Sequence, residues 1–207
     1  MQLKSIVAAA LFGAASAVEV IPVLVGMNAN GTAGTFFSPD KVTAPVGSMV
    51  QFQFMGGNHT VTQSTFDQPC TPISAINASA VGVNTGYVPA MNAMQSGQIP
   101  VYSIMINDTR PIWLYCAQGR HCQSGMVMVI NENTAANSSR SIENHRTLAA
   151  TVQQATLPSG VPGNNNGGQT GDNTQDNNNN GNVPGAAADI RVPAALLAVA
   201  AGAAMFL

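Results

Sequence analysis

The sequence predicts an all-β sandwich domain followed by a disordered stalk. In residues 50–54, Val, Phe and Phe alternate with Gln, which is the period of a half-buried strand, and residues 102–106 show the same alternation. Turn-forming Gly, Pro and Asn separate these short segments, and no convincing long helical pattern interrupts them. Short alternating strands with turns between them are typical of a β-sandwich.

The remaining strands can be placed in order along the chain. Residues 18–25 form an expected first strand, in which Pro22 indicates a sheet edge or a bulge because it lacks a backbone donor. The two alternating segments follow, and residues 126–130 form an expected final strand. Residues 71–98 are rich in small residues without a clear period, so we expect a long connection there with room for a short helix.

The first 17 residues have the features of a secretory signal peptide. One Lys precedes an apolar run from Ile6 to Ala14, and Ala15-Ser16-Ala17 then provide a small-residue cleavage site. This apolar run is too short for a membrane-spanning helix, which needs about 20 apolar residues. We therefore expect cleavage after Ala17 and secretion of the mature protein.

Residues 186–207 are typical of the signal for a glycosylphosphatidylinositol (GPI) anchor. An apolar tail runs to the last position, and no basic residue follows it as would be usual after a spanning helix. Small residues around Gly185 precede the tail across a short polar spacer, and Asn180 and Asn182 are alternative attachment sites. The signal is removed on maturation, so we expect membrane attachment through the lipid anchor only.

The chain between these two signals divides into two expected parts. A folded domain spans residues 18–134, and residues 135–185 form a low-complexity stalk. The stalk is rich in Asn and Gly and has almost no apolar surface to bury, so its burial cannot offset the entropy of ordering. A short helix within residues 140–156 is the one ordered element considered for it.

Charge and sequons limit the classes of function. Between residues 18 and 185 the chain has five Lys or Arg and eight Asp or Glu, which gives no basic surface for nucleic acid. Five Asn-X-Ser/Thr sequons fit a secreted glycoprotein. The candidates for glycosylation are Asn30, Asn77, Asn107 and Asn137.

One segment near the end of the domain carries the groups of a metal site. Four residues separate the thiol of Cys116 from the imidazole of His121, and four separate His121 from the thioether of Met126. Two His nitrogens and one Cys thiolate in a plane, with a weak axial Met, form a blue-copper site. A single loop between two strands can supply the Cys, one His and the Met.

The second imidazole must come from elsewhere in the chain. The sequence offers His59, at the exit of a predicted core strand, and His145, which lies beyond the last strand. His59 is the better candidate because it directly follows the core strand. The expected ligands of one copper ion are therefore His59, Cys116, His121 and Met126.

The three cysteines bear on the same site. A secreted chain with three Cys leaves one unpaired unless it pairs between molecules, and a Cys70–Cys122 bond leaves Cys116 for the metal. His121 and Cys122 are adjacent, so in an extended loop their side chains point to opposite sides. The alternative bond, Cys116 to Cys122, closes a tight loop and destroys the site.

The domain resembles the phytocyanin branch of the cupredoxins, and more closely the fungal extracellular, surface-anchored cupredoxin-like proteins. The resemblance rests on the ligand spacing above with Cys122 beside the second His, and on the run Phe-Gln-Phe-Met-Gly-Gly-Asn-His-Thr-Val at 52–61. The turn at 44–47 and Pro111-Ile-Trp113 also belong to it. It covers about residues 18–131 and implies a Greek-key sandwich and copper-based electron transfer.

The four proposed ligands match the ligand positions of that family one by one. One departure is the sequon Asn58-His59-Thr60, which overlaps a ligand. A glycan on Asn58 would crowd the copper, so we expect this sequon to be unused.

The expected function is one-electron transfer by a copper that alternates between Cu(I) and Cu(II). No pair of a general acid and a general base is visible, so we do not expect an enzyme. Two alternatives stay open: storage or delivery of copper without redox traffic, and a cell-wall or adhesion module on the same scaffold. The sequence does not identify the redox partner or the copper donor or acceptor.

Overall fold

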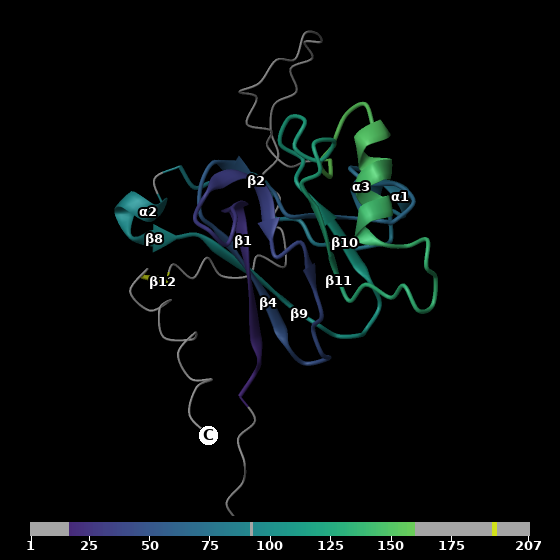
Figure 1. Ribbon diagram of the computed structural model, residues 1–207, viewed down its shortest axis with the longest axis horizontal. Coiled ribbons are helices and arrows are strands. Elements are labelled where there is room, and N and C mark those ends of the chain that lie inside the picture. Colours follow the sequence, from purple (N-terminus) through teal and green to yellow (C-terminus); the bar gives the residue numbers. More distant parts are fainter. Residues whose placement is uncertain (1–16, 92, 160–191, 194–207) are drawn as a thin grey trace, which may run out of the picture.

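The computed structural model describes residues 17–91, 93–159 and 192–193 (Figure 1). The predicted signal peptide, apart from Ala17, and most of the predicted stalk and anchor signal lie outside these described residues. Among the residues that are described, no helix has the length and apolar character needed to cross a membrane.

Two four-stranded sheets form the sandwich. Their strands are β1 (Val20–Met27), β2 (Ala33–Ser38), β3 (Lys41–Val42), β4 (Met49–Phe54), β6 (Thr62–Ser64), β9 (Val101–Met105), β10 (Ile112–Tyr115) and β11 (Val127–Ile130). The first sheet has the order β2-β1-β4-β9 and the second the order β3-β11-β10-β6. The pairs β1–β4 and β3–β11 are parallel, and the other pairs are antiparallel. The chain therefore crosses between the sheets repeatedly, as in a Greek-key β-sandwich.

Short elements fill the connections. They are β5 (Asn58–His59), α1 (Ile73–Ile76), β7 (Val88–Pro89), α2 (Ala93–Ser96), β8 (Gln98–Ile99), α3 (Ile142–Thr151) and β12 (Val192–Pro193). β5 pairs with β7, and β8 pairs with β12. The region 71–98 is thus a long connection that contains two single-turn helices, close to the expectation from sequence.

The apolar residues of the alternating segments meet between the sheets. Val50, Phe52 and Phe54 of β4 are at most 1% exposed, and they share one core with Leu114 of β10 and Met128 of β11. The period-2 pattern puts these side chains on one face of each strand. The predicted sandwich is confirmed.

Pro22 lies within the first sheet and is not at a bulge. It pairs with Gln51 of β4, but the pairing of β1 with β2 begins only at Leu24, so no partner is lost where Pro22 lacks its N–H. The register shift of β1 falls between Val25 and Met27 instead. β1 is therefore not an edge strand as a whole. Within the described sheet, only its first residues, before Leu24, are unpaired on the side that faces β2.

The packed part of the chain extends past the expected domain end at residue 134. α3 lies against the outer face of the second sheet (Figure 1), where Ile142, His145 and Ala149 are buried in a second core with Val127 and Val129 of β11. All four residues of β11 are buried, because alternate residues face the sandwich core and α3. The boundary at 134 is therefore too early.

Contacts beyond α3 set the new boundary. The Tyr115 hydroxyl donates a hydrogen bond to the Thr156 carbonyl, and the Thr156 N–H donates to the Cys70 carbonyl at 3.0 Å. Leu157 packs against the same second core. The structure therefore extends the folded domain to about residue 157.

The buried imidazole of His145 makes the docking of α3 sensitive to pH. His145 Nδ1 lies 3.2 Å from the Phe66 carbonyl, and Nε2 has no partner among the described residues. Burial, reinforced by the charge of Arg146, lowers the pKa of His145 to about 4. The unfolded chain takes up this proton near pH 6.5 and the folded chain only near pH 4. The contribution of His145 to stability is therefore fully present above about pH 6.5 and is lost towards pH 4, by about 1.4 kcal/mol per pH unit.

Chemical denaturation between pH 7 and 4 tests this expectation. The His145→Leu variant lacks the buried imidazole, so its stability should fall less steeply with acid than that of the wild type. Comparing the two proteins cancels the titration of every other group. Equal slopes would show that His145 does not contribute to the pH dependence.

Candidate metal centre

Two separate segments, β5 and the loop between β10 and β11, bring the predicted donors together. His59 lies on β5, Cys116 follows β10, and Met126 precedes β11. His121 sits in the turn between β10 and β11, where its N–H donates to the Gln118 carbonyl at 2.9 Å. Both ends of this turn are tied together, because the Cys116 N–H donates to the Met126 carbonyl at 3.1 Å and the Met126 N–H to the His121 carbonyl at 2.9 Å. The sandwich therefore fixes the base of the loop.

The two imidazoles converge on the thiol. Cys116 Sγ lies 3.7 Å from His59 Nδ1 and 3.5 Å from His121 Nδ1. The donor atoms of the three residues all lie within 4.8 Å of one another. Cys116 is fully buried and His59 is nearly so, whereas His121 is half-buried at the rim. The two nitrogens and the sulfur thus form a triangle in which His121 is the most exposed member.

The size of this triangle fits one metal ion. Metal–nitrogen and metal–sulfur bonds of about 2.0 and 2.3 Å at trigonal angles place a nitrogen and a sulfur about 3.7 Å apart. The observed separations of 3.5 and 3.7 Å agree with that value. One soft thiolate with two imidazoles is the equatorial donor set of a blue-copper site. Met126, which is 1% exposed, borders the site at the end of the loop and supplies the candidate axial thioether.

The protonation states also suit a metal. Burial lowers the pKa of His59 to about 4, with a further decrease from the neighbouring His121, and burial lowers the pKa of His121 as well. Both rings are therefore neutral near pH 7, as metal ligands must be. Burial raises the pKa of the Cys116 thiol to about 11, so a metal must displace its proton on binding.

Backbone donors partly offset the burial of the Cys116 sulfur. The Thr60 N–H donates to Sγ at 3.3 Å, and hydrogen bonds from Thr60 and Gln118 lower the pKa of the thiol against the effect of burial. Thr60 Oγ1 also accepts from the Ala117 N–H at 2.8 Å, which links the His59 segment to the Cys116 segment. Sequence reasoning did not identify Thr60, because its role depends on the pairing of two distant segments.

Two glycines give the His59 ring its space, and sequence reasoning missed this role too. A Cβ on Gly26 would lie 2.8 Å from His59 Cδ2 and 2.3 Å from the Gly56 carbonyl oxygen, and a Cβ on Gly57 would lie 2.7 Å from His59 Nε2. Both glycines also have positive φ angles, of 82° and 70°. Gly57 could have been suspected from its place beside the ligand, but Gly26 is distant in sequence.

Cys122 faces away from the metal centre. It forms a disulfide with Cys70 in the second core, while the adjacent His121 faces Cys116. The alternative bond between Cys116 and Cys122 is absent, and Cys116 is a free, buried thiol. Residues 121 and 122 face opposite sides as expected, but they do so in a series of hydrogen-bonded turns and not in the extended loop assumed from the sequence.

Loss of this disulfide should destabilise the protein and leave the ligands in place. The bond joins residues separated by 52 positions, so the paired change Cys70→Ser and Cys122→Ser should lower the free energy of unfolding by about 2–4 kcal/mol through loop entropy. The double change prevents Cys122 from capturing Cys116. Peptide mapping without reduction should recover Cys70 and Cys122 in one crosslinked fragment, and a fragment containing Cys116 instead would contradict the assignment.

Asn58 is poorly placed to carry a glycan. Its side chain lies inside the site region, where Nδ2 is 3.4 Å from Gln118 Oε1 and Oδ1 is buried without a partner among the described residues. These contacts support the expectation that this sequon is unused.

Together, the sandwich and its Cys-His-His triangle define the protein as a copper-binding β-sandwich of the blue-copper class. Comparison with models of protein families gives no match. The chain is 31% identical over 205 residues to a probable GPI-anchored cupredoxin of Arthroderma benhamiae, an alignment that covers 98% of this chain and 95% of that protein. By this relationship, the chain belongs to the cupredoxin family.

Other comparisons are more partial. The chain is 31% identical over 160 residues to an extracellular serine-rich protein of Arthroderma benhamiae and spans 56% of the length of that relative. Among solved structures, pseudoazurin from Hyphomicrobium denitrificans is similar with a TM-score of 0.40 at 17% identity. The superposition covers 65% of this chain and 99% of the pseudoazurin chain. Oxidized plastocyanin from Dryopteris crassirhizoma has a TM-score of 0.35 at 19% identity, and its superposition covers 53% of this chain and 96% of the plastocyanin chain.

Proposed function

We propose that this protein is a one-electron carrier of the cell surface, with one copper ion held by His59, Cys116, His121 and Met126. The convergence of the two Nδ1 atoms on the Cys116 sulfur, at 3.7 and 3.5 Å, is the observation that carries the proposal. Bound copper would supply a Cu(I)/Cu(II) couple. The chain's own residues keep the donors in place, exclude water from the sulfur and connect the site to the surface.

The fixed positions of the donors favour electron transfer over storage. Hydrogen bonds from Thr60 and within the 116–126 loop hold the sulfur and both loop ends without help from a metal. Electron transfer is fast when the ligands need not move between oxidation states. A store that releases copper would instead need a site that opens. No catalytic role is assigned to any residue.

The His121 side of the site is suited to an uncharged contact surface. His121 lies at the rim of a shallow depression of about 370 Å³. The depression is also lined by Gly34, Thr35, Asn58 and Gln118, and none of its lining residues is acidic or basic apart from the two neutral imidazoles. A partner that docks here would meet little fixed charge. Its association rate should therefore depend weakly on ionic strength.

Repeated redox cycling separates carrier from store. The copper-loaded protein is reduced and reoxidised with an artificial one-electron reagent in the presence of a Cu(I) chelator, and electron exchange and copper content are both followed. A carrier exchanges electrons rapidly and keeps its copper through many cycles. Loss of copper to the chelator on the first reduction would favour storage or delivery.

The location is part of the same proposal. Residues 1–17 would direct secretion, a linker from about residue 158 would follow the folded domain, and residues 186–207 would be exchanged for a GPI anchor. Support comes from the relative described as a probable GPI-anchored cupredoxin, which aligns over 98% of this chain.

Enzymatic release from cells tests the anchor. A phospholipase specific for the glycolipid should move the protein from the cell surface into the medium, because lipid would be its only hold on the membrane. Limited proteolysis should then cut the linker and leave a resistant core that ends near residue 157 and not near 134. Retention on the membrane while a control GPI protein is released would contradict the anchor.

A further inference from the structure

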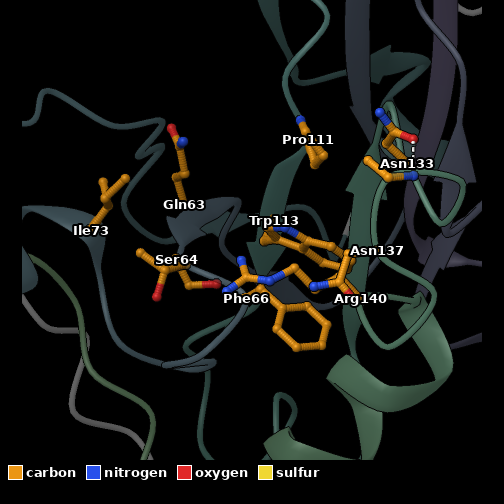
Figure 2. Close-up of a pocket in the computed structure, with 11 residues that line it drawn as sticks. Gln63, Ser64, Phe66, Ile73, Pro111, Trp113, Asn133, Asn137 and Arg140 are labelled. Atoms are coloured by element: carbon orange, nitrogen blue, oxygen red, sulfur yellow. Dashed lines mark hydrogen bonds between the residues drawn. The ribbon is translucent and has the colours of Figure 1, made fainter.

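A second pocket lies on the surface of the domain, outside the metal centre. Its cavity of about 360 Å³ is bounded by the end of β6, by β10 and by residues 133–140 (Figure 2). Trp113, Phe66 and Pro111 contribute apolar groups to its lining, and Asn133, Asn137 and Arg140 contribute polar ones. Pockets of about 300–1,000 Å³ that combine apolar walls with a few polar groups are typical of small-ligand sites.

The walls of this pocket are held by their own contacts. Phe66 and Trp113 pack edge to face with ring centroids 4.9 Å apart. Arg140 lies over the Phe66 ring at 5.1 Å and donates to Asp67 at 2.6 Å. Figure 2 shows the Trp113 indole extending beside Asn137. The pocket is therefore formed before any ligand enters.

Asn137 at the rim is the acceptor position of the sequon Asn137-Ser138-Ser139. The N–H and the hydroxyl of Ser139 both donate to Asn137 Oδ1, at 3.0 and 2.7 Å. The Asn137 side chain is exposed, and among the described residues both of its hydrogen bonds are accepted by Oδ1. The amide nitrogen Nδ2, to which a glycan is attached, is therefore left accessible. Ser139 thus orients the amide for modification.

We propose that Asn137 carries an N-linked glycan whose first sugar packs into this pocket against Pro111 and the accessible edge of Trp113, which is 5% exposed. A sugar ring offers an apolar C–H face to the apolar lining of the pocket and hydroxyls to the amides beside it. The covalent link starts at the rim and raises the effective concentration of the sugar in the pocket.

The modification needs a donor of the secretory route, so the inference rests on the secretion part of the proposed function. The donor is a lipid-diphosphate-linked oligosaccharide. Its anomeric C–O bond breaks, a C–N bond to Asn137 Nδ2 forms, and the lipid diphosphate leaves with the bonding electrons. Nδ2 releases one proton, so no oxidant or reductant is required.

Trp113 makes the docking measurable, because it is the only tryptophan of the chain. The full chain is produced in a host that attaches N-glycans, and acrylamide quenching of Trp113 fluorescence is compared at equal copper loading. Trp113 lines the pocket and is 5% exposed, so a sugar seated there would cover the accessible edge of the indole. Removal of the sequon by Ser139→Ala should therefore raise the quenching constant. Ser139→Thr keeps the sequon and should match the wild type.

A matched control and a trimming experiment complete the test. Asn77 also accepts from the N–H of its third sequon residue, at 3.0 Å, but does not line the pocket, so Asn77→Gln should leave quenching unchanged. An endoglycosidase that leaves only the first sugar should preserve the protection, and complete removal of the glycan should abolish it. Equal quenching with and without the glycan overturns the inference. An unmodified Asn137 also overturns it, while modification at Asn77 in the same sample would leave the secretion proposal standing.

Discussion

Replacing Cys116 by Ser is expected to abolish the intense visible absorption of the copper-loaded protein. That absorption requires a short, covalent bond between copper and a thiolate, and Cys116 is the only free cysteine among the described residues. The hydroxyl of Ser is a far weaker ligand, although His59 and His121, whose ring centroids are 5.0 Å apart, still offer two nitrogens. Copper should therefore bind more weakly and without strong colour, as measured by a visible spectrum and a copper titration.

Changes at Met126 provide the matched comparison. Met126→Leu keeps the trigonal set of donors and should stay coloured, while Met126→Gln offers an amide oxygen in the axial position and should shift the redox potential. Voltammetry of each variant with one copper bound measures that shift. A folded, copper-loaded Met126→Leu protein without colour would show that Met126 is not a weak axial ligand. A spectrum like that of the wild type from Cys116→Ser would remove the thiolate assignment altogether.

Replacing Gly26 by Ala is expected to damage both the fold and the metal site. The new Cβ would lie 2.3 Å from the Gly56 carbonyl oxygen and 2.8 Å from two atoms of the His59 ring, at a residue whose φ is 82°. A backbone oxygen cannot move aside as a flexible side chain can. Left-handed strain of about 1–2 kcal/mol and overpacking of about 1–3 kcal/mol should together lower the free energy of unfolding by about 2–5 kcal/mol. Copper affinity should fall because the His59 ring is displaced.

Gly47 is the control for backbone strain alone. Its φ is 88°, but nothing lies within 4 Å of an added Cβ. Gly47→Ala should therefore cost only about 1–2 kcal/mol and leave copper affinity unchanged. Denaturant titrations and copper titrations of both variants give the comparison. If Gly26→Ala behaves like Gly47→Ala, the contact with His59 does not shape the site.

The sandwich could be predicted because its information is local. Apolar and polar residues alternate at 50–54 and 102–106, and turn residues separate these segments. This pattern predicts β-strands, and the structure has strands at both places. The docking of α3 could not be predicted with the same ease, since its buried face consists only of Ile142, His145 and Ala149 in an otherwise polar segment. One signal was available: the continuous apolar run at 126–130 indicates a strand covered on both faces, which requires a second layer beyond the sandwich.

The donor set could be predicted for a different reason. The spacing of Cys116, His121 and Met126 is a property of one loop, and only His59 had to be chosen from elsewhere in the chain. The supporting contacts could not be predicted, because they join segments far apart in sequence. The Thr60 N–H reaches the sulfur of a residue 56 positions away, and Gly26 meets His59 through the contact of β1 with β5.

The visible spectrum of the copper-reconstituted protein tests the central proposal most directly. The folded domain, from residue 18 to about 157, is titrated with Cu(II) and the thiolate–copper absorption is followed against copper content. A site built from His59, Cys116 and His121 should bind one copper per chain, develop an intense visible band that saturates at that ratio, and lose the band reversibly on reduction. A folded protein that binds no copper, or binds it without the band, would contradict the assignment of a blue-copper centre.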